Sequence, residues 1–164
     1  MTLATCHDDE AYCCSLFYTY MDDEGCFVFS SENSTRHVRN LSHNMVVSAC
    51  IALETEMVGN IQGLQLQGLV YRPSGVLAKA ARRAYMRRFP YAALFHTPFW
   101  VLEPTWAKLT DNRLGFGKKL TWEKDKLVDI DFLNEKHAKG QGTIPAPVPR
   151  PLSPTCTSTT PPNP

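Results

Sequence analysis

The sequence predicts a small, mostly antiparallel β-barrel that carries two helices. Short runs rich in β-branched and aromatic residues follow one another with brief polar connections. Two other segments instead space their apolar residues at the helical period, and they do not alternate regularly with the strands. This order excludes a doubly wound parallel sheet, in which strands and helices alternate, and favours a barrel built mainly from successive strands.

The expected strands number about six, and polar or glycine-containing turns separate them. A turn over residues 21–25 closes a hairpin, and Gly63 and Gly68 indicate bends or a bulge. Pro104 divides the last strand into two pieces, because proline cannot donate a ladder hydrogen bond. The segments predicted as strands are residues 3–6, 12–20, 26–29, 46–53, 61–70, 99–102 and 106–110.

The two predicted helices cover residues 35–41 and 76–88, and Pro90 ends the second one. Small and apolar side chains of the second helix share one face, and basic side chains lie off that face. The basic residues are Lys79, Arg82, Arg83 and Arg87. They could form a nucleic-acid patch, but a solvated helix face is the simpler interpretation.

Charge and cysteine content narrow the function classes. Of 164 residues, 17 are basic and 16 acidic, so the net charge of +1 gives no reason to expect nucleic acid as a partner. No apolar run is long enough to cross a membrane, and no secretory signal follows Met1. The six cysteines lack metal-ligand spacing, so we expect no metal site and a reducing, cytoplasmic location.

The C-terminal part differs in composition from the rest. Residues 140–164 hold eight of the twelve prolines and almost no large apolar side chain. Such a segment cannot bury enough surface to offset its ordering entropy. We therefore expect a barrel domain over residues 1–123, a polar extension over residues 124–139, and a disordered proline- and threonine-rich tail.

The most informative stretch is a strand, a hydroxyl-rich turn and a helix start. The strand over residues 26–29 leads into the turn, and the first helical turn carries Arg36 and His37 instead of the usual acidic residue. Unpaired backbone N–H groups and two basic side chains are typical of a phosphate site. The alternative is that Ser34 or Thr35 is an ordinary N-cap and the basic groups are solvated.

A second candidate feature lies in residues 106–122. Gly115 and Gly117 allow close backbone approach to a ligand, Phe116 could stack on a flat ring, and Lys118 adds positive charge. A β-turn with solubilising lysines is the alternative. The segment is neither a P-loop nor a dinucleotide fingerprint, since the required hydroxyl residue and third glycine are missing.

These features together resemble the pyridoxamine 5′-phosphate oxidase superfamily, the FMN-binding split barrels, in which a hydroxyl-bearing strand end precedes a Ser-Arg-Lys-like triplet. A small, mainly bacterial split-barrel family is more similar still. Its members carry T-R-H, I-x-G-x-Q-x-x-G, Y-x-x-R-F-P and T-D-N-x-L-G-F-G-K-K motifs. The matching segments here are residues 35–37, 61–68, 85–90 and 110–119, within a resemblance that covers residues 3–122.

The resemblance implies a split-barrel homodimer with FMN at the subunit interface, and a flavin-dependent oxidoreductase of unknown substrate. It places the flavin and its phosphate at Ser30, Ser31, Thr35, Arg36 and His37, with Phe116 and Lys118 as further contacts. It identifies no catalytic residue. The substrate-binding residues of pyridoxamine phosphate oxidases are not recognisable, so that specific activity is not transferred.

This sequence departs from the superfamily pattern in three respects. His37 stands where the triplet typically ends in lysine, and it is a weaker, pH-dependent cation. Residues 12–20 contain none of the upstream basic residues, so Arg36 is expected to hold phosphate largely alone. The helix that usually precedes the first strand is also expected to be missing.

Two other functions stay open on the sequence. One is a flavin-free split-barrel interaction module whose proline-rich run over residues 145–151 docks a partner as polyproline II. The other is a heme-binding split barrel with His37 or His43 as the iron ligand.

Overall fold

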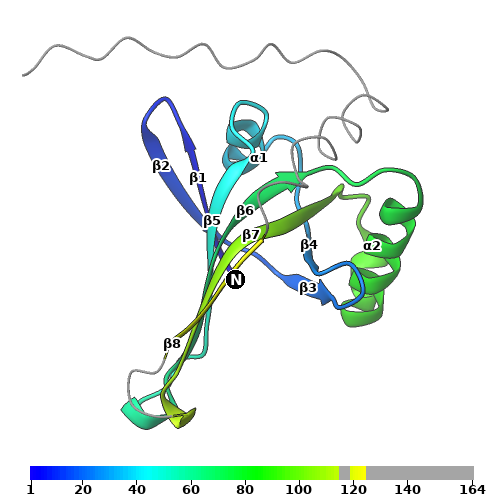
Figure 1. The fold of residues 1–164 in the computed structure, drawn as a ribbon. Coiled ribbons are helices and arrows are strands. Elements are labelled where there is room, and N and C mark those ends of the chain that lie inside the picture. The colour runs from blue at the N-terminus through cyan, green and yellow to red at the C-terminus, as the bar shows by residue number, and fades with distance from the viewer. Residues whose placement is uncertain (115–118, 125–164) are drawn as a thin grey trace, which may run out of the picture.

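The computed structural model describes residues 1–114 and 119–124, which form one antiparallel sheet with two α-helices beside it (Figure 1). This is the mostly β fold with two helices that the sequence predicts. The strands are β1 (Thr2–His7), β2 (Glu10–Ser15), β3 (Tyr18–Met21), β4 (Cys26–Ser30), β5 (Val46–Ala52), β6 (Gln62–Tyr71), β7 (Phe99–Asp111) and β8 (Lys119–Glu123). The helices are α1 (Arg36–Leu41) and α2 (Gly75–Arg88), with short 3-10 turns η1 (Val58–Asn60), η2 (Pro90–Leu94) and η3 (Asn112–Leu114).

The strand order is β2-β1-β5-β6-β7-β4-β3, and β8 pairs with β7 outside this path. One edge of β7 serves two partners, because its first part pairs with β4 and its second part with β8. In the described part of the chain, β2 and β3 are not hydrogen-bonded to each other. The sheet therefore curves without closing its ladder completely.

Strand β4 is buried on both faces, and this explains its unbroken apolar sequence. Successive side chains of a strand point to opposite faces. Phe27 and Phe29 enter the core inside the curved sheet, whereas Cys26 and Val28 enter a second core under α2. The strand is thus the wall between two hydrophobic layers, as expected for a continuous apolar run.

Helix α2 covers the outer face of β3, β4 and β7. Ala81 and Tyr85 are its buried residues, and the small Ala81 lets the helix approach the sheet closely. Lys79 and Arg83 are exposed on the opposite side, which fits a solvated helix face. No helix in the described ranges is both long and apolar enough to cross a membrane.

The prediction of a single strand over residues 12–20 was wrong. The structure breaks it after Ser15 and restarts it at Tyr18, with exposed Phe17 in between. The two halves belong to opposite ends of the strand order, so the chain must leave β2 before it can enter β3. Local β-propensity does not reveal this break, because aromatic residues lie on both sides of it, Tyr12 before and Tyr18 and Tyr20 after.

The predicted division at Pro104 was also wrong, since β7 runs through it. Gln67 pairs with Trp106 but Gly68 pairs with Pro104, so Thr105 is an extra residue in β7. This bulge provides an unpaired position next to the proline. A Cβ atom on Gly68 would clash with the Glu103 carbonyl oxygen, so glycine is required there. The bulge predicted from Gly68 is confirmed.

Candidate functional site

The turn between β4 and α1 forms a compact hydrogen-bonded cluster. Ser31 Oγ lies 2.6 Å from His37 Nε2 and 3.3 Å from Thr35 Oγ1. Thr35 Oγ1 in turn donates to the Glu32 carbonyl at 2.8 Å. Three of the predicted phosphate-site residues are therefore brought together by the structure.

The backbone of Ser31 is fixed to the start of β7. Its N–H donates to the Pro98 carbonyl at 3.1 Å, and the Trp100 indole N–H donates to the Ser31 carbonyl at 3.1 Å. With both backbone groups satisfied, the side chain of Ser31 keeps a defined direction towards His37.

His37 is the buried titratable group of this cluster. Its side chain belongs to a residue that is only 5% exposed, and burial lowers the pKa of the imidazole below its ordinary value. Because the Thr35 hydroxyl donates its hydrogen bond to the Glu32 carbonyl, the Ser31 hydroxyl donates either to Oγ1 of Thr35 or to Nε2 of His37. In either case Nδ1 of His37 is buried without a hydrogen-bond partner in the described chain.

Arg36 is directed away from this cluster, onto β2. Its Nη2 lies 2.6 Å from Oε2 of Glu10, and its guanidinium carbon lies 5.0 Å from the centre of the Tyr12 ring. The arginine side chain is 46% exposed and the glutamate side chain 75% exposed. An ion pair this exposed is weak and exchanges readily with another anion.

A second cation, Arg72, reaches the turn from the position directly after β6, and sequence reasoning missed it. Arg72 donates to Oδ1 of Asn33 at 3.2 Å, and its guanidinium carbon lies 5.2 Å from the Trp100 ring centre. Nothing in the local sequence around Arg72 links it to a turn about forty residues earlier. Only the pairing of β6 with β7 and of β7 with β4 brings the two together.

Helix α1 begins without a side-chain cap. Thr35 is the N-cap residue, yet it makes no capping hydrogen bond, and the first turn contains no acidic residue. An uncapped start leaves backbone N–H groups for another acceptor. The ordinary N-cap interpretation of Thr35 is thus not what the structure shows.

Ser30 does not join its predicted partners. Ser30 lies on the same face of β4 as Val28, which packs under α2. It lines a separate cavity together with Tyr85 and Phe89. Its hydroxyl donates to the Pro98 carbonyl at 3.3 Å. Adjacent serines at a strand end point to different sides, so the predicted site is divided here. Phe116 and Lys118 lie outside the described residues.

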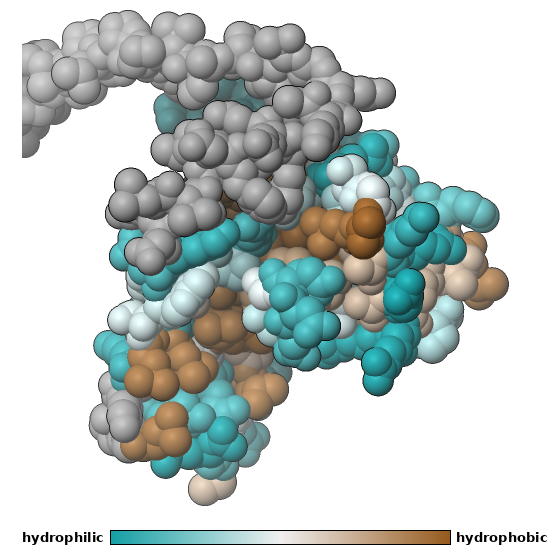
Figure 2. Space-filling view, turned by 45° about the vertical axis from the view of Figure 1, so that its right-hand side comes forward, coloured by the Kyte–Doolittle hydropathy of each residue, from teal (hydrophilic) through white to brown (hydrophobic). Residues whose placement is uncertain are grey.

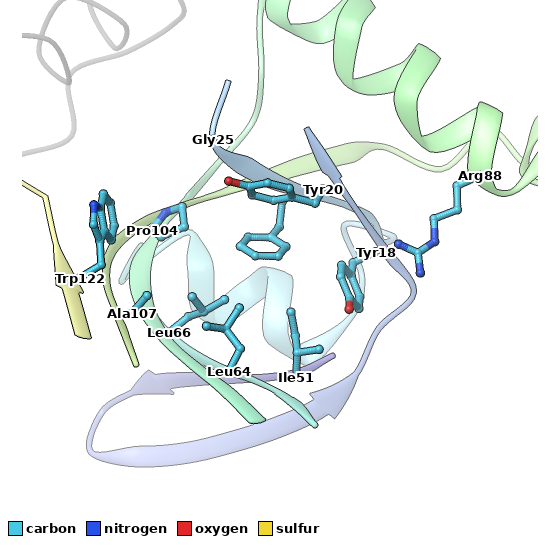
Figure 3. Close-up of a pocket in the computed structure, with 11 residues that line it drawn as sticks. Tyr18, Tyr20, Gly25, Ile51, Leu64, Leu66, Arg88, Pro104, Ala107 and Trp122 are labelled. Carbon is cyan, nitrogen blue, oxygen red and sulfur yellow. The ribbon is translucent and has the colours of Figure 1, made fainter. Parts of the chain in front are cut away.

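A cavity of about 680 Å³ lies among the strands of the curved sheet (Figure 3). Its lining side chains come from five strands of the main sheet, from β8 and from the end of α2, and they converge on one space. They are Tyr18, Tyr20, Gly25, Phe27, Ile51, Leu64, Leu66, Arg88, Pro104, Ala107 and Trp122. Sequence reasoning did not find this cavity, because it is made by segments that are distant in the chain.

Neither of the histidines proposed as heme ligands lines this cavity. His37 is bonded to Ser31, and His43 stacks on His7 with ring centres 4.0 Å apart. The charged residue in the lining is Arg88, whose guanidinium carbon lies 5.2 Å from the Tyr18 ring centre. In the described residues no group of three or more metal-ligating side chains occurs.

Several solved structures share the fold of this chain. A heme-binding protein from Mycobacterium smegmatis superposes with a TM-score of 0.65 at 22% identity, over 74% of this chain and 51% of that one. This chain thus spans about half of that protein. A pyridoxamine 5′-phosphate oxidase-related, FMN-binding protein from Nostoc punctiforme gives 0.56 at 10% identity, over 77% of this chain and 81% of that one.

A FAD-binding protein from Mesorhizobium loti gives a TM-score of 0.54 at 15% identity, over 65% of this chain and 80% of that one. The fold is therefore that of the split-barrel proteins related to pyridoxamine 5′-phosphate oxidase. Identities this low establish the fold alone.

Sequence relatives identify the family. A UPF0306 protein of Photorhabdus laumondii is 40% identical over 124 residues, which are 76% of this chain and 87% of the relative. A UPF0306 protein of Klebsiella pneumoniae is 36% identical over 125 residues, or 76% and 85% of the two chains. The chain belongs to the UPF0306 family. No protein-family model matches it.

Proposed function

We propose that this protein binds FMN and acts as a flavin-dependent oxidoreductase. The observation that carries the proposal is the uncapped start of α1 beside Arg36, at the strand–turn–helix segment where the resemblance places the phosphate. The FMN- and FAD-binding proteins with a similar fold support it. When bound, the flavin would supply one- and two-electron transfer, and the protein would supply binding and orientation.

Two cations of the described chain suit the phosphate. Arg36 would exchange the exposed carboxylate of Glu10 for a phosphate oxygen, and Arg72, which contacts Asn33 of the same turn, would add a second guanidinium. The sequence had implied that Arg36 holds the phosphate largely alone, but Arg72 is a second cation that could share this role.

The hydroxyls of Ser31 and Thr35 and the neutral imidazole of His37 complete the proposed cradle. They are already bonded to one another, so they would act by holding the turn in shape and by accepting or donating one further hydrogen bond. Phe116 and Lys118 remain predicted contacts of the flavin ring.

We also propose a homodimer. Figure 2 shows hydrophobic residues, in brown, gathered at the lower end of the molecule, where Figure 1 places the β5–β6 connection. Leu53 is 65% exposed there, Met57 66% and Val58 57%. Exposed apolar surface of this kind is typical of an interface, and a second copy would cover it.

The cytoplasm is the proposed location. The five cysteines of the described residues are all free thiols, and two of them, Cys13 and Cys50, are exposed. Free exposed thiols persist in a reducing compartment.

The direct test compares FMN with riboflavin, which lacks the phosphate. Arg36→Ala should weaken FMN binding about tenfold, since a charge-assisted hydrogen bond is lost, and should leave riboflavin binding unchanged. Arg83→Ala, which removes an exposed arginine from the outer face of α2, is the matched control. Equal FMN affinity in wild type and Arg36→Ala would contradict the phosphate assignment.

Heme is the second candidate, and the large apolar cavity favours it. Tyr18 and Tyr20 could offer a phenolate to iron, and Arg88 could pair with a propionate. Heme would then sit away from the histidines that the sequence had suggested. A Soret band on hemin addition that Tyr18→Phe or Tyr20→Phe removes would support this candidate over FMN.

A further inference from the structure

A second, smaller cavity lies between the end of β4, the last turn of α2 and η2, and neither the Ser31–His37 cluster nor the large cavity accounts for it. Its volume is about 260 Å³. Most of its lining side chains are aromatic, and the others are small or carry a hydroxyl. The lining consists of Phe17, Ser30, Tyr85, Phe89, Tyr91, Ala92, Phe95 and Thr97. We call it the ring pocket.

The ring pocket has a fixed floor and an open wall. Tyr85 is 6% exposed and packs against Phe89 with ring centres 5.0 Å apart, and Phe17 meets the same Phe89 edge-on at 5.6 Å. Around this floor Phe17 is 76% exposed, Tyr91 70% and Phe95 65%. Three large aromatic side chains left in water beside one hollow favour a ligand that covers them.

The lining carries no full charge, so an ionic ligand has no partner in it. The polar groups that line it include the hydroxyls of Ser30 and Thr97, and each of them already donates a hydrogen bond within the protein. Ser30 donates to the Pro98 carbonyl at 3.3 Å, and Thr97 donates to Oε1 of Glu32 at 3.4 Å. Each hydroxyl oxygen keeps lone pairs and can only accept from a ligand while those bonds persist.

We propose that the ring pocket binds a neutral, planar aromatic heterocycle of one or two fused rings that carries a ring N–H, the class to which indole belongs. The volume lies just below the usual range of small-molecule pockets, about 300–1,000 Å³, which limits the ligand to this size. The aromatic lining selects a flat ring, and the acceptor oxygens of Ser30 and Thr97 select an N–H donor. The site needs no flavin, so it stands independently of the proposed function.

The experiment titrates the full-length, ¹⁵N-labelled protein with indole and follows amide shifts and heats of binding. 1-Methylindole, which has the same rings without the N–H, is the comparison probe. Phe95→Ala should weaken indole binding about tenfold by removing one aromatic wall. Leu94→Ala is the matched control, because Leu94 is 78% exposed in the same η2 turn but does not line the pocket.

Ser30→Ala tests the polar half of the proposal. Wild type should prefer indole over 1-methylindole, and the variant should lose about fivefold of that preference, the equivalent of one hydrogen bond. Phe95 and Leu94 are both largely exposed, so their variants should keep the far-ultraviolet spectrum of the wild type. The proposal is overturned if indole shifts no amide of the lining at millimolar concentration, or if Phe95→Ala and Leu94→Ala bind indole equally. Equal binding of the two probes to wild type would remove the N–H donor from the proposal.

Discussion

Nη2 of Arg36 lies 2.6 Å from Oε2 of Glu10, so the cation expected to bind phosphate is paired with a carboxylate of the chain itself. The two residues are 26 positions apart, and the β1–β2 hairpin together with the packing of α1 against it brings them together. Both side chains of the pair are exposed, and the Arg36 guanidinium stacks over the Tyr12 ring. Phosphate binding would therefore be a competition between an external and an internal anion.

Replacing Glu10 by Gln should strengthen FMN binding by about 1.4- to fivefold, because an exposed ion pair of about 0.2–1 kcal/mol no longer competes. Titration of flavin fluorescence measures this directly. Glu24→Gln, an exposed carboxylate in the β3–β4 turn, is the control for the change in net charge. Weaker FMN binding in Glu10→Gln than in Glu24→Gln would mean that Glu10 assists the ligand.

Ser31→Ala should lower the free energy of unfolding by about 1–3 kcal/mol, because Nε2 of His37 loses its 2.6 Å partner while it stays buried. Urea denaturation gives the value. Ser34→Ala in the same turn is an exposed comparison and should change stability by no more than about 0.5 kcal/mol. If both variants unfold at the same urea concentration, the cluster does not stabilise the fold.

Stability should fall as the pH drops below about 6.5, the ordinary pKa of histidine. Burial lowers the pKa of His37 in the folded state, so the unfolded state binds a proton at higher pH than the folded state does. Acid therefore stabilises the unfolded state relative to the folded one. The stabilisation is complete above the unfolded pKa and is lost as pH falls towards the folded pKa. His37→Gln should make the denaturation midpoint less dependent on pH between 7.5 and 5.5, conditions chosen about one unit either side of that pKa.

His96→Gln provides the comparison for this pH experiment, since His96 is exposed. It should keep the wild-type pH dependence. A His37→Gln variant that loses stability on acidification as steeply as the wild type would show that other groups carry the effect.

Gly68→Ala should destabilise the protein by about 1–3 kcal/mol through overpacking at the bulge. The added Cβ would meet backbone atoms of β7, which cannot rotate away as a side chain would. Gly63→Ala on the same strand meets nothing within 4 Å and is the matched control. Thermal unfolding of the two variants compares them, and equal midpoints would contradict the bulge geometry.

The elements that the sequence predicted well are those with a local signal. The alternation in β6, the helical spacing of α2 and the apolar run of β4 each depend on neighbours in the chain, and all three agree with the structure. Gly68 was also informative, because a glycine inside a strand often marks a bulge or a close approach of another backbone segment.

The candidate site was only partly accessible from the sequence. Ser31, Thr35 and His37 are close in the chain, so their meeting in one turn could be anticipated. The contacts of Arg36 with Glu10 and of Asn33 with Arg72 depend on how distant strands pair. The burial that lowers the pKa of His37 also depends on tertiary packing, which a three-residue motif does not encode.

FMN binding is best tested by the absorbance spectrum of the full-length protein after it has been purified, incubated with FMN and passed through a desalting column. We expect visible flavin bands that stay with the protein at about one FMN per chain, with riboflavin retained less well because it lacks the phosphate. A protein that emerges colourless after FMN, or that shows a Soret band instead, would contradict the assignment of FMN to the turn between β4 and α1.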